Sequence, residues 1–435
     1  MPFPGRMPRL NRPLTPCLAP IAGLALLISA CNTPDAALGV NETPLTDAGG
    51  HASSSLLTRF DLGTLGGASS YAADINSDDV VVGWSDTKSG ASHAFRWSPT
   101  GGIVDLGTLP GDAASRAVAI IDGSTTSGAQ ILGVSGTERN WTPVVWSASG
   151  AISRLPIPVM PEFSFGLPVG FNGRGDVVGW DTGAPGQHGW AWSASDGKFD
   201  LSANVHGGSN EGAAGGITAS GLVLLTTRAY TCQRTAECWR TYTWTQSSGY
   251  SSIGTPASDP EANVTGLDVN DAGTIVGWFT LGQNGAAPYR WAASTGFTAL
   301  PHYSTGSEGY GYATAVNATG TVVGADLEPA SGSIVATAWS PTGAISRLTA
   351  GDPNASVAVA INNAGTIAGW ATVSDRVNHA VVWSSTLKAS HTSLNVSVPV
   401  GRFLSAASTP CLKGVRGVLS RQALFACATE ADRTR

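Results

Sequence analysis

The sequence predicts an all-β protein, a single β-propeller built from four-stranded antiparallel blades. One observation is a phrase of strand, Asn-x-x-Gly turn and strand, which recurs about every 45 to 50 residues and is clearest at 74–84, 268–278 and 360–370. A second is a tryptophan at a fixed place in the following strand. The third is the composition, with 55 Gly, 14 Trp and 12% charged residues in 435. Small β units at this period are typical of propeller blades.

Each copy of the repeat reads as four strands. In the first copy these are expected at Tyr71–Ile75, Val80–Trp84, His93–Trp97 and Ile103–Leu106. The turn between the first two strands opens on Asn and closes on Gly, which supplies a positive φ. The third and fourth strands are joined by Ser-x-x-Gly, a second short hairpin. Successive hairpins exclude a parallel β-helix.

The number of copies follows from the tryptophan of the third strand. It recurs at intervals of 44 to 52 residues, at Trp97, Trp146, Trp192, Trp244, Trp291, Trp339 and Trp383. The second strand closes on glycine in every copy except the fourth, where Leu225 takes its place. Seven complete copies follow from this spacing.

The two ends of the chain suggest one further blade. Three tail segments resemble the first, second and third strands of a copy: Phe403–Ala407, Gly414–Leu419 and Arg421–Phe425. Near the start, Phe60–Leu65 resembles the fourth-strand segment Val104–Leu109. We therefore expect the N-terminal strand to complete the C-terminal blade, which closes the ring and removes exposed sheet edges. The expected domain is an eight-bladed propeller over residues 57–430, followed by a tail at 431–435. Seven blades with an irregular tail are the alternative.

The N-terminus has the pattern of an export signal. Arg6, Arg9 and Arg12 precede an apolar stretch at 21–28 that is too short to span a bilayer. The stretch ends in Ile-Ser-Ala-Cys31, which resembles the lipobox of bacterial lipoproteins. This resemblance implies removal of residues 1–30 and lipidation of Cys31, so that the protein is exported and held at the cell envelope by lipid. An ordinary secretory signal is the alternative. Residues 31–56, rich in Thr, Ala, Asp, Gly and Ser, are predicted to be a flexible tether.

Cysteine usage agrees with an oxidising compartment. Four cysteines remain after the signal and the lipid site: Cys232, Cys238, Cys411 and Cys427. We expect two disulfides, Cys232–Cys238 and Cys411–Cys427, with four buried thiols as the alternative. No Cys-x-x-Cys pair suggests a zinc site.

The charge balance argues against nucleic acid as a partner. Without the three arginines of the signal, 21 Lys and Arg face 30 Asp and Glu, a net charge of −9. A nucleic-acid-binding surface requires the opposite sign.

Several phrases together resemble the bacterial HAF-repeat family of extracellular repeats. They are Asp61–Gly67, Ile75-Asn76, Val81–Gly83 and the His93-Ala94-Phe95 after which the family is named. The likeness covers nearly all of the chain after the signal, but is eroded in later copies, for example at Thr142-Pro143-Val144. It implies a repeat fold and an extracytoplasmic location. It brings no catalytic residues and no cofactor.

The repeated polar and aromatic residues are interpreted as structural. A tryptophan or histidine present in blade after blade is expected to pack one blade on the next. Asp74, Asn76 and Asp78 alternate as in a calcium loop, but the turn explains the asparagine, so no metal is predicted. The sequence contains no Gly-x-Ser-x-Gly, His-Glu-x-x-His or phosphate-loop motif.

The connections that vary between copies are the better place to look for a ligand. They join second to third strands and one blade to the next, and in a propeller they share one face. The candidate ligand residues on this face are aromatic: Trp141, Phe163, Tyr230, Trp239 and Tyr303. The alternative is that these side chains cover the blade ends.

The sequence therefore favours a monomeric binding or scaffold module for protein or glycan ligands, without catalysis, that touches the membrane only through its lipid. A propeller hydrolase or lyase acting on glycans is the alternative function, and a structural envelope protein without a discrete ligand is a third. Convergent carboxylates, or a histidine with a carboxylate, at the mouth of the channel would favour the enzyme. A broad aromatic patch would favour binding.

Overall fold

In a computed structural model, the structure describes residues 57–124, 128–137, 140–158, 163–183, 187–202, 205, 208–229, 238–281, 285–303, 309–348, 354–374 and 377–387. The chain divides into two units, Met1–Thr43 and Pro44–Arg435, and every described residue belongs to the second. None of the described residues forms a helix long and apolar enough to cross a membrane.

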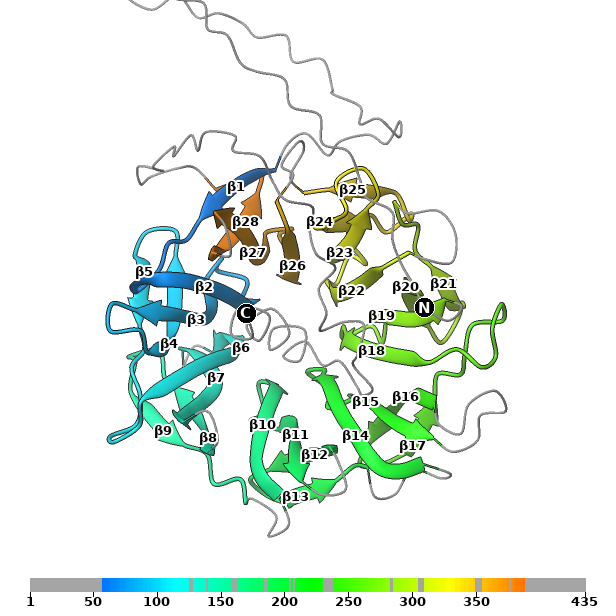
Figure 1. The fold of residues 1–435 in the computed structure, drawn as a ribbon. Coiled ribbons are helices and arrows are strands. Elements are labelled where there is room, and N and C mark those ends of the chain that lie inside the picture. Colours follow the sequence, from blue (N-terminus) through cyan, green and yellow to red (C-terminus); the bar gives the residue numbers. More distant parts are fainter. Residues whose placement is uncertain are drawn as a thin grey trace, which may run out of the picture. The chain divides into compact units, whose positions relative to one another are not determined.

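The described residues form seven four-stranded antiparallel sheets arranged as blades around an axis (Figure 1). Blade 1 comprises β2 (Gly66–Ile75), β3 (Val81–Thr87), β4 (Ser92–Ser98) and β5 (Gly102–Asp105). Blade 2 comprises β6 (Ala114–Ser124), β7 (Gly128–Thr137), β8 (Asn140–Trp146) and β9 (Ile152–Arg154). Blade 3 comprises β10 (Phe163–Phe171), β11 (Val177–Gly183), β12 (Gln187–Ser193) and β13 (Gly197–Asp200).

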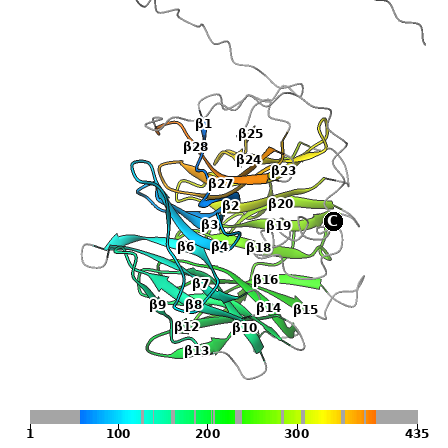
Figure 2. The ribbon, with the colours of Figure 1, turned by 60° about the vertical axis from the view of Figure 1, so that its left-hand side comes forward.

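The remaining blades repeat this order. Blade 4 comprises β14 (Gly208–Ile217), β15 (Val223–Ala229), β16 (Cys238–Thr245) and β17 (Gly249–Ser252). Blade 5 comprises β18 (Val264–Val269), β19 (Ile275–Leu281), β20 (Gly285–Ala292) and β21 (Gly296–Ala299). Blade 6 comprises β22 (Gly311–Val316), β23 (Val322–Glu328), β24 (Ser333–Trp339) and β25 (Ile345–Arg347). Figure 2 shows the blades following one another in sequence order.

Blade 7 combines strands from both ends of the described chain. It comprises β26 (Ser356–Ile361), β27 (Ile367–Ser374), β28 (Val377–Ser384) and β1 (Thr58–Asp61). β1 pairs with β28 over four residues, from Thr58 opposite Ser384 to Asp61 opposite Val381. The prediction of an all-β propeller with four-stranded blades is confirmed.

The predicted count of eight blades is wrong, because the described chain forms seven. The strand at the N-terminus, expected to complete a blade made by residues 403–425, lies beside β28 of the seventh copy instead. The outer position of blade 7 is thereby filled. The tail segments on which the eighth blade depended lie outside the described residues.

The glycine of the second strand permits a close approach within six of the seven blades, blade 4 having Leu225 instead. A Cβ placed on Gly83 would lie 1.9 Å from the carbonyl oxygen of Tyr71 on the neighbouring strand, and Gly369 has the same conflict with Val357 at 2.1 Å. Any side chain there would push the two strands apart. The turn that follows the first strand needs positive φ, which Gly365 provides at 86° and Asp79 provides in blade 1 at 58°.

The third-strand tryptophans pack between blades. Trp146, Trp339 and Trp383 have no exposed surface. The indole N–H of Trp146 donates to the carbonyl of Leu106 in blade 1 at 2.8 Å, and that of Trp339 donates to Pro301 at 2.6 Å, at the end of blade 5. Each ring thus buries apolar area, and Trp146 and Trp339 also satisfy their indole N–H on the preceding blade.

Candidate functional site

The central cavity is lined by the first strands of all seven blades. It has a volume of about 160 Å³. In every blade the pairing of the first strand with the second has a register shift near the end of the first strand. The first paired residue after that shift lines the wall of the cavity. These seven residues are Asp74, Ala119, Gly170, Gly216, Asp268, Ala315 and Ala360. Five of them are Ala or Gly, which leaves two carboxylates as the polar side chains of this inner ring.

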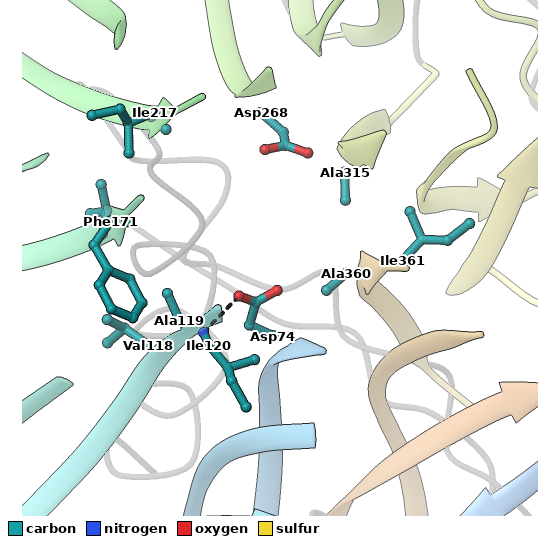
Figure 3. Close-up of a pocket in the computed structure, with 14 residues that line it drawn as sticks. Asp74, Val118, Ala119, Ile120, Phe171, Ile217, Asp268, Ala315, Ala360 and Ile361 are labelled. Carbon is teal, nitrogen blue, oxygen red and sulfur yellow. Dashed lines mark hydrogen bonds between the residues drawn. The ribbon is translucent and has the colours of Figure 1, made fainter. Parts of the chain in front are cut away.

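Both inner carboxylates bind the backbone of the next blade. Oδ2 of Asp74 accepts the N–H of Ile120 at 2.9 Å, and Oδ2 of Asp268 accepts the N–H of Val316 at 2.9 Å. Figure 3 shows the two side chains reaching the cavity from different sides. The two carboxylates therefore join blade 1 to blade 2 and blade 5 to blade 6.

The residues that resemble a calcium loop have separate roles. Oδ1 of Asn76 accepts the N–H groups of Asp78 and Val80, at 3.1 and 2.9 Å, and so closes the turn. Asp74 instead faces the cavity. Across the described ranges, no group of three or more His, Cys, Asp or Glu side chains is placed to hold a metal ion.

The turn asparagines also form a chain of bonds from blade to blade. Nδ2 of Asn270 donates to the carbonyl of Asn317 at 2.9 Å, and Nδ2 of Asn317 donates to that of Asn362 at 3.2 Å. Asn362 then donates to the carbonyl of Asn76 at 2.9 Å, which links blade 7 to blade 1. Asn270, Asn317 and Asn362 thus each serve their own turn through the side-chain oxygen and the next blade through the side-chain nitrogen.

The repeated histidines pair with the aspartates of the fourth strand. Nδ1 of His93 lies 2.9 Å from Asp105, and Nδ1 of His379 lies 2.8 Å from Asp61. His188 and Asp200 are 3.5 Å apart in blade 3. The hydrogen bond that His379 donates to the carboxylate of Asp61 raises the pKa of His379, although burial opposes the rise. Burial alone would raise the pKa of Asp61, but the bonds from His379 and the Gly63 amide lower it.

Blade 3 carries a buried ion pair between Lys198 and Asp181. The Nζ of Lys198 bonds to Asp181 and to the carbonyl of Pro158, and it lies 4.9 Å from the ring centre of Trp190. The side chains of Lys198 and Asp181 are 4% and 1% exposed. Burial raises the pKa of Asp181, and the bond from Lys198 lowers it by less.

The predicted ligand aromatics that the structure describes are separated around the ring. Trp141 is buried, with the guanidinium of Arg116 5.4 Å from its ring centre. Trp239 packs partly buried beside Trp180, and Tyr303 packs in the cluster that contains Trp339. These three side chains therefore do not form one patch.

The other predicted site residues lie partly or wholly outside the described side chains. Phe163 begins β10 opposite Gly183, and nothing is described of its side chain. Tyr230, Cys31, Cys232, Cys411 and Cys427 lie outside the described residues. Cys238 is buried at the start of β16, opposite Ala229. The two disulfides and the lipidation of Cys31 stay predictions.

The sequence reasoning missed one exposed aromatic pair. Phe199 on β13 is 43% exposed and stacks on Trp244 of β16, with ring centres 5.4 Å apart and planes 20° from parallel. The pair joins the rims of blades 3 and 4. A signal for it existed, because most copies have Ser or Thr where Phe199 stands: Ser153, Ser251, Thr298 and Ser346.

These features define a seven-bladed β-propeller whose repeated polar groups hold strand to strand and blade to blade. No family model matches the sequence, and no curated protein matches it either. The fold is similar to that of puromycin hydrolase, with a TM-score of 0.51 and 15% identity, over 75% of this chain and 53% of that one. This chain thus spans about half the length of that hydrolase.

Two further solved structures align with lower scores. Virginiamycin B lyase from Staphylococcus aureus aligns with a TM-score of 0.47 and 13% identity, over 75% of this chain and 98% of that one. The Aleuria aurantia lectin aligns with a TM-score of 0.40 and 11% identity, over 66% of this chain and 96% of that one. At such identities the likeness concerns the fold alone.

Proposed function

We propose that the protein is a lipid-anchored, extracytoplasmic propeller of the HAF-repeat type that binds protein or glycan ligands and does not catalyse a reaction. The observation that carries this proposal is the stack of Phe199 on Trp244. Phe199 is one of two large apolar side chains exposed in the described chain, and its ring is held in place by a second ring beneath it. A rigid aromatic surface offers large contact area at low entropic cost, which suits a binding site.

The groups with catalytic chemistry support the same proposal. Asp74, Asp268 and the turn asparagines hold neighbouring blades together, and the histidines bind the aspartates of their own blades. These side chains are therefore fixed by structural bonds in the described ring. We therefore expect the ligand to contact residues that differ from the repeat, such as Phe199.

The N-terminus has two roles in this proposal. Lipidated Cys31 and the tether at 31–56 hold the propeller at the envelope, and β1 closes the ring by its pairing with β28. Mass spectrometry of the exported protein tests the anchor, since a mature chain that begins at an unmodified Cys31 would refute it. Deletion of residues 57–67 tests closure, and a truncated chain as stable as the intact one would contradict it.

Ligand capture tests the binding role. The soluble propeller is presented to envelope proteins and to an array of bacterial and host glycans, beside the double variant F199A/W244A. The matched control is Val104→Ala, because Val104 occupies the same fourth-strand position in blade 1 and is 40% exposed. We expect a ligand retained by the native chain and by V104A and lost by the double variant. Retention by all three proteins would overturn the assignment, and cleavage of a captured glycan would favour a hydrolase or lyase.

A further inference from the structure

The platform formed by Phe199 and Trp244 is too small for a protein interface. With 43% of its surface exposed, Phe199 offers roughly 65 to 110 Å² of apolar area. A standard protein interface covers about 800 Å² on each partner and has several large anchors near its centre. Among the described residues, the other exposed large apolar side chain is Val104, which belongs to blade 1. The platform therefore has the size of a single flat ligand ring.

The geometry of the stack suits a sugar ring. One face of the Phe199 ring lies on Trp244, with planes 20° from parallel, so the exposed surface belongs to the other face and the edge. An aromatic face carries partial negative charge and attracts C–H groups, which are slightly positive. A pyranose ring has a face of axial C–H groups that can lie flat on such a surface. The second ring beneath Phe199 holds the platform in one orientation.

Two hairpin turns beside the platform supply hydrogen-bonding groups. Residues 193–197 of blade 3 lead into Phe199, and residues 245–249 of blade 4 follow Trp244. The carboxylate of Asp196 in the first turn is hydrogen-bonded to the side chain of Gln246 in the second. Both side chains are exposed. A carboxylate and an amide side by side can accept bonds from the hydroxyl groups of a sugar and donate to them.

Blade 3 departs from the repeat at two positions of this surface. The corresponding turns of blades 1, 2, 4, 5 and 6 contain no acidic residue, whereas blade 3 has Asp196. Three residues later, Phe199 stands where four other copies have Ser or Thr. Residues needed to pack a blade recur from copy to copy, so two departures this close together favour a role in binding.

We propose that this surface binds a neutral pyranose ring of a glycan, with Phe199 stacked on the sugar and Asp196 and Gln246 bonded to its hydroxyl groups. The inference rests on the binding role proposed above and names the ligand class for the same site. It chooses a glycan over a protein because of the size of the platform and the polar side chains at its edge.

The electrostatics favour a neutral sugar over an acidic one. Oδ2 of Asp196 accepts the hydroxyl groups of Ser193 and Ser195, each at 2.8 Å. These two bonds, and to a lesser degree the bond from Gln246, lower the pKa of Asp196. The carboxylate is therefore charged at neutral pH, and a uronate or sialate ring would bring a second negative charge beside it. Like charges brought together in this way oppose binding.

Saturation-transfer NMR on the full chain tests the ligand class. The neutral probes are cellohexaose, maltohexaose, mannohexaose and chitohexaose, and hexagalacturonate is the acidic probe. We expect saturation of the protein's aromatic protons to reach the ring C–H groups of a neutral sugar and not those of hexagalacturonate. Absence of transfer to every neutral sugar would overturn the proposal, as would equal transfer to the acidic one.

Two variants assign the binding to this surface. Phe199→Ser introduces the residue type of other copies, and loss of the exposed ring should weaken binding of the sugar by roughly 10- to 100-fold. Val104→Ala is the matched control and should leave binding unchanged. Asp196→Asn should admit hexagalacturonate, which keeps the test independent of how F199S folds. Undiminished sugar binding by F199S, or continued exclusion of hexagalacturonate by D196N, would contradict the assignment.

Failure of the ligand class is distinguishable from failure of the binding role. A protein captured by the native chain and lost by F199A/W244A, without binding of any neutral sugar, would refute the glycan and leave the binding role standing. Capture of neither protein nor sugar through Phe199 and Trp244 would refute both.

Discussion

Asp61 and His379 are 318 residues apart in sequence, yet Oδ2 of Asp61 lies 2.8 Å from Nδ1 of His379. The contact joins β1 to β28, which share blade 7 without any hairpin between them. In blade 1 the same contact, His93 with Asp105, joins two strands of one hairpin. The His-Ala-Phe and Asp-Leu-Gly phrases of the repeat are therefore two halves of a single contact.

Asp61→Asn should destabilise the propeller in a limited pH window. The pKa of Asp61 is lowered and that of His379 is raised. The pair thus stabilises the fold above the ordinary Asp pKa and below the ordinary His pKa, between about pH 4 and 6.5. Below this range Asp61 gains its proton, and above it His379 loses its own.

Urea unfolding at pH 5.5 and pH 8.5 measures this effect. Because Asp61 is 48% exposed, solvent screens the pair, and we expect a loss of about 0.5 to 1 kcal/mol at pH 5.5 that shrinks at pH 8.5. Asp105→Asn is the matched control, and amide exchange should increase in β1 of the first variant more than in β5 of the second. Equal losses at both pH values would contradict the assignment.

Asn317 tests the bonds between neighbouring turns. Its Nδ2 donates to Asn362 while its Oδ1 accepts the N–H groups of Thr319 and Thr321. Asn317→Asp keeps the acceptor and removes the donor, so it isolates the interblade bond. We expect thermal unfolding to show a loss of about 1 to 3 kcal/mol for Asn317→Ala and a smaller loss for Asn317→Asp. Equal losses would place the whole effect in the interblade bond, and no loss for Asn317→Asp would place it in the turn.

The sequence predicted the blades because the residues that repeat from copy to copy are those that the packing of each blade requires. Glycine is required at Gly83 because a Cβ there would lie 1.9 Å from a carbonyl oxygen. Asparagine recurs at Asn76 because its side chain closes the turn. The eighth blade was a misreading, since a tail that resembles three strands does not show which sheet edge the N-terminal strand occupies. Pairing over such a long separation depends on three-dimensional proximity, which the pattern does not encode.

The candidate site was less predictable for the same reason. Trp141 looked like a ligand residue because it stands in a variable connection, yet it is buried beside Arg116. Phe199 lies in a regular strand, and only the structure shows that its exposed ring stacks on Trp244 of the next blade. Blade-to-blade contacts decide which aromatic ring is covered, and a single copy of the repeat does not specify them.

Gly189→Ala should reveal how the fourth copy tolerates Leu225 in place of glycine. A Cβ on Gly189 would lie 2.7 Å from Cδ1 of Leu225, which is fully buried in the next blade. Blades 1 and 7 carry Ala94 and Ala380 at this position. We expect Gly189→Ala to cost about 1 to 3 kcal/mol in urea unfolding, and Leu225→Val in the same chain to recover part of it. A Gly189→Ala variant of native stability would show that the leucine can move aside.

The buried pair of Lys198 and Asp181 should be replaceable as a unit but not singly. Blade 1 has Ile103 at the Lys198 position and Ser85 at the Asp181 position, and blade 2 has Ile152 and Ser135 there. Asp181→Ser alone leaves a buried ammonium group without its carboxylate, and we expect it to cost about 3 to 5 kcal/mol. Lys198→Ile alone leaves the carboxylate, which can escape the penalty by taking up a proton, so its cost should be smaller at pH 5 than at pH 8.

The double variant carries the decisive comparison. Asp181→Ser with Lys198→Ile restores the residue types of blade 1 and removes both desolvation costs, so we expect stability equal to the native chain or about 1 to 4 kcal/mol higher. Urea unfolding of the four proteins at pH 7 gives the coupling energy of the pair. A double variant as unstable as the sum of the single changes would mean that the two charges act separately. In that case Lys198 would owe its place to Pro158 and Trp190, which its Nζ also contacts.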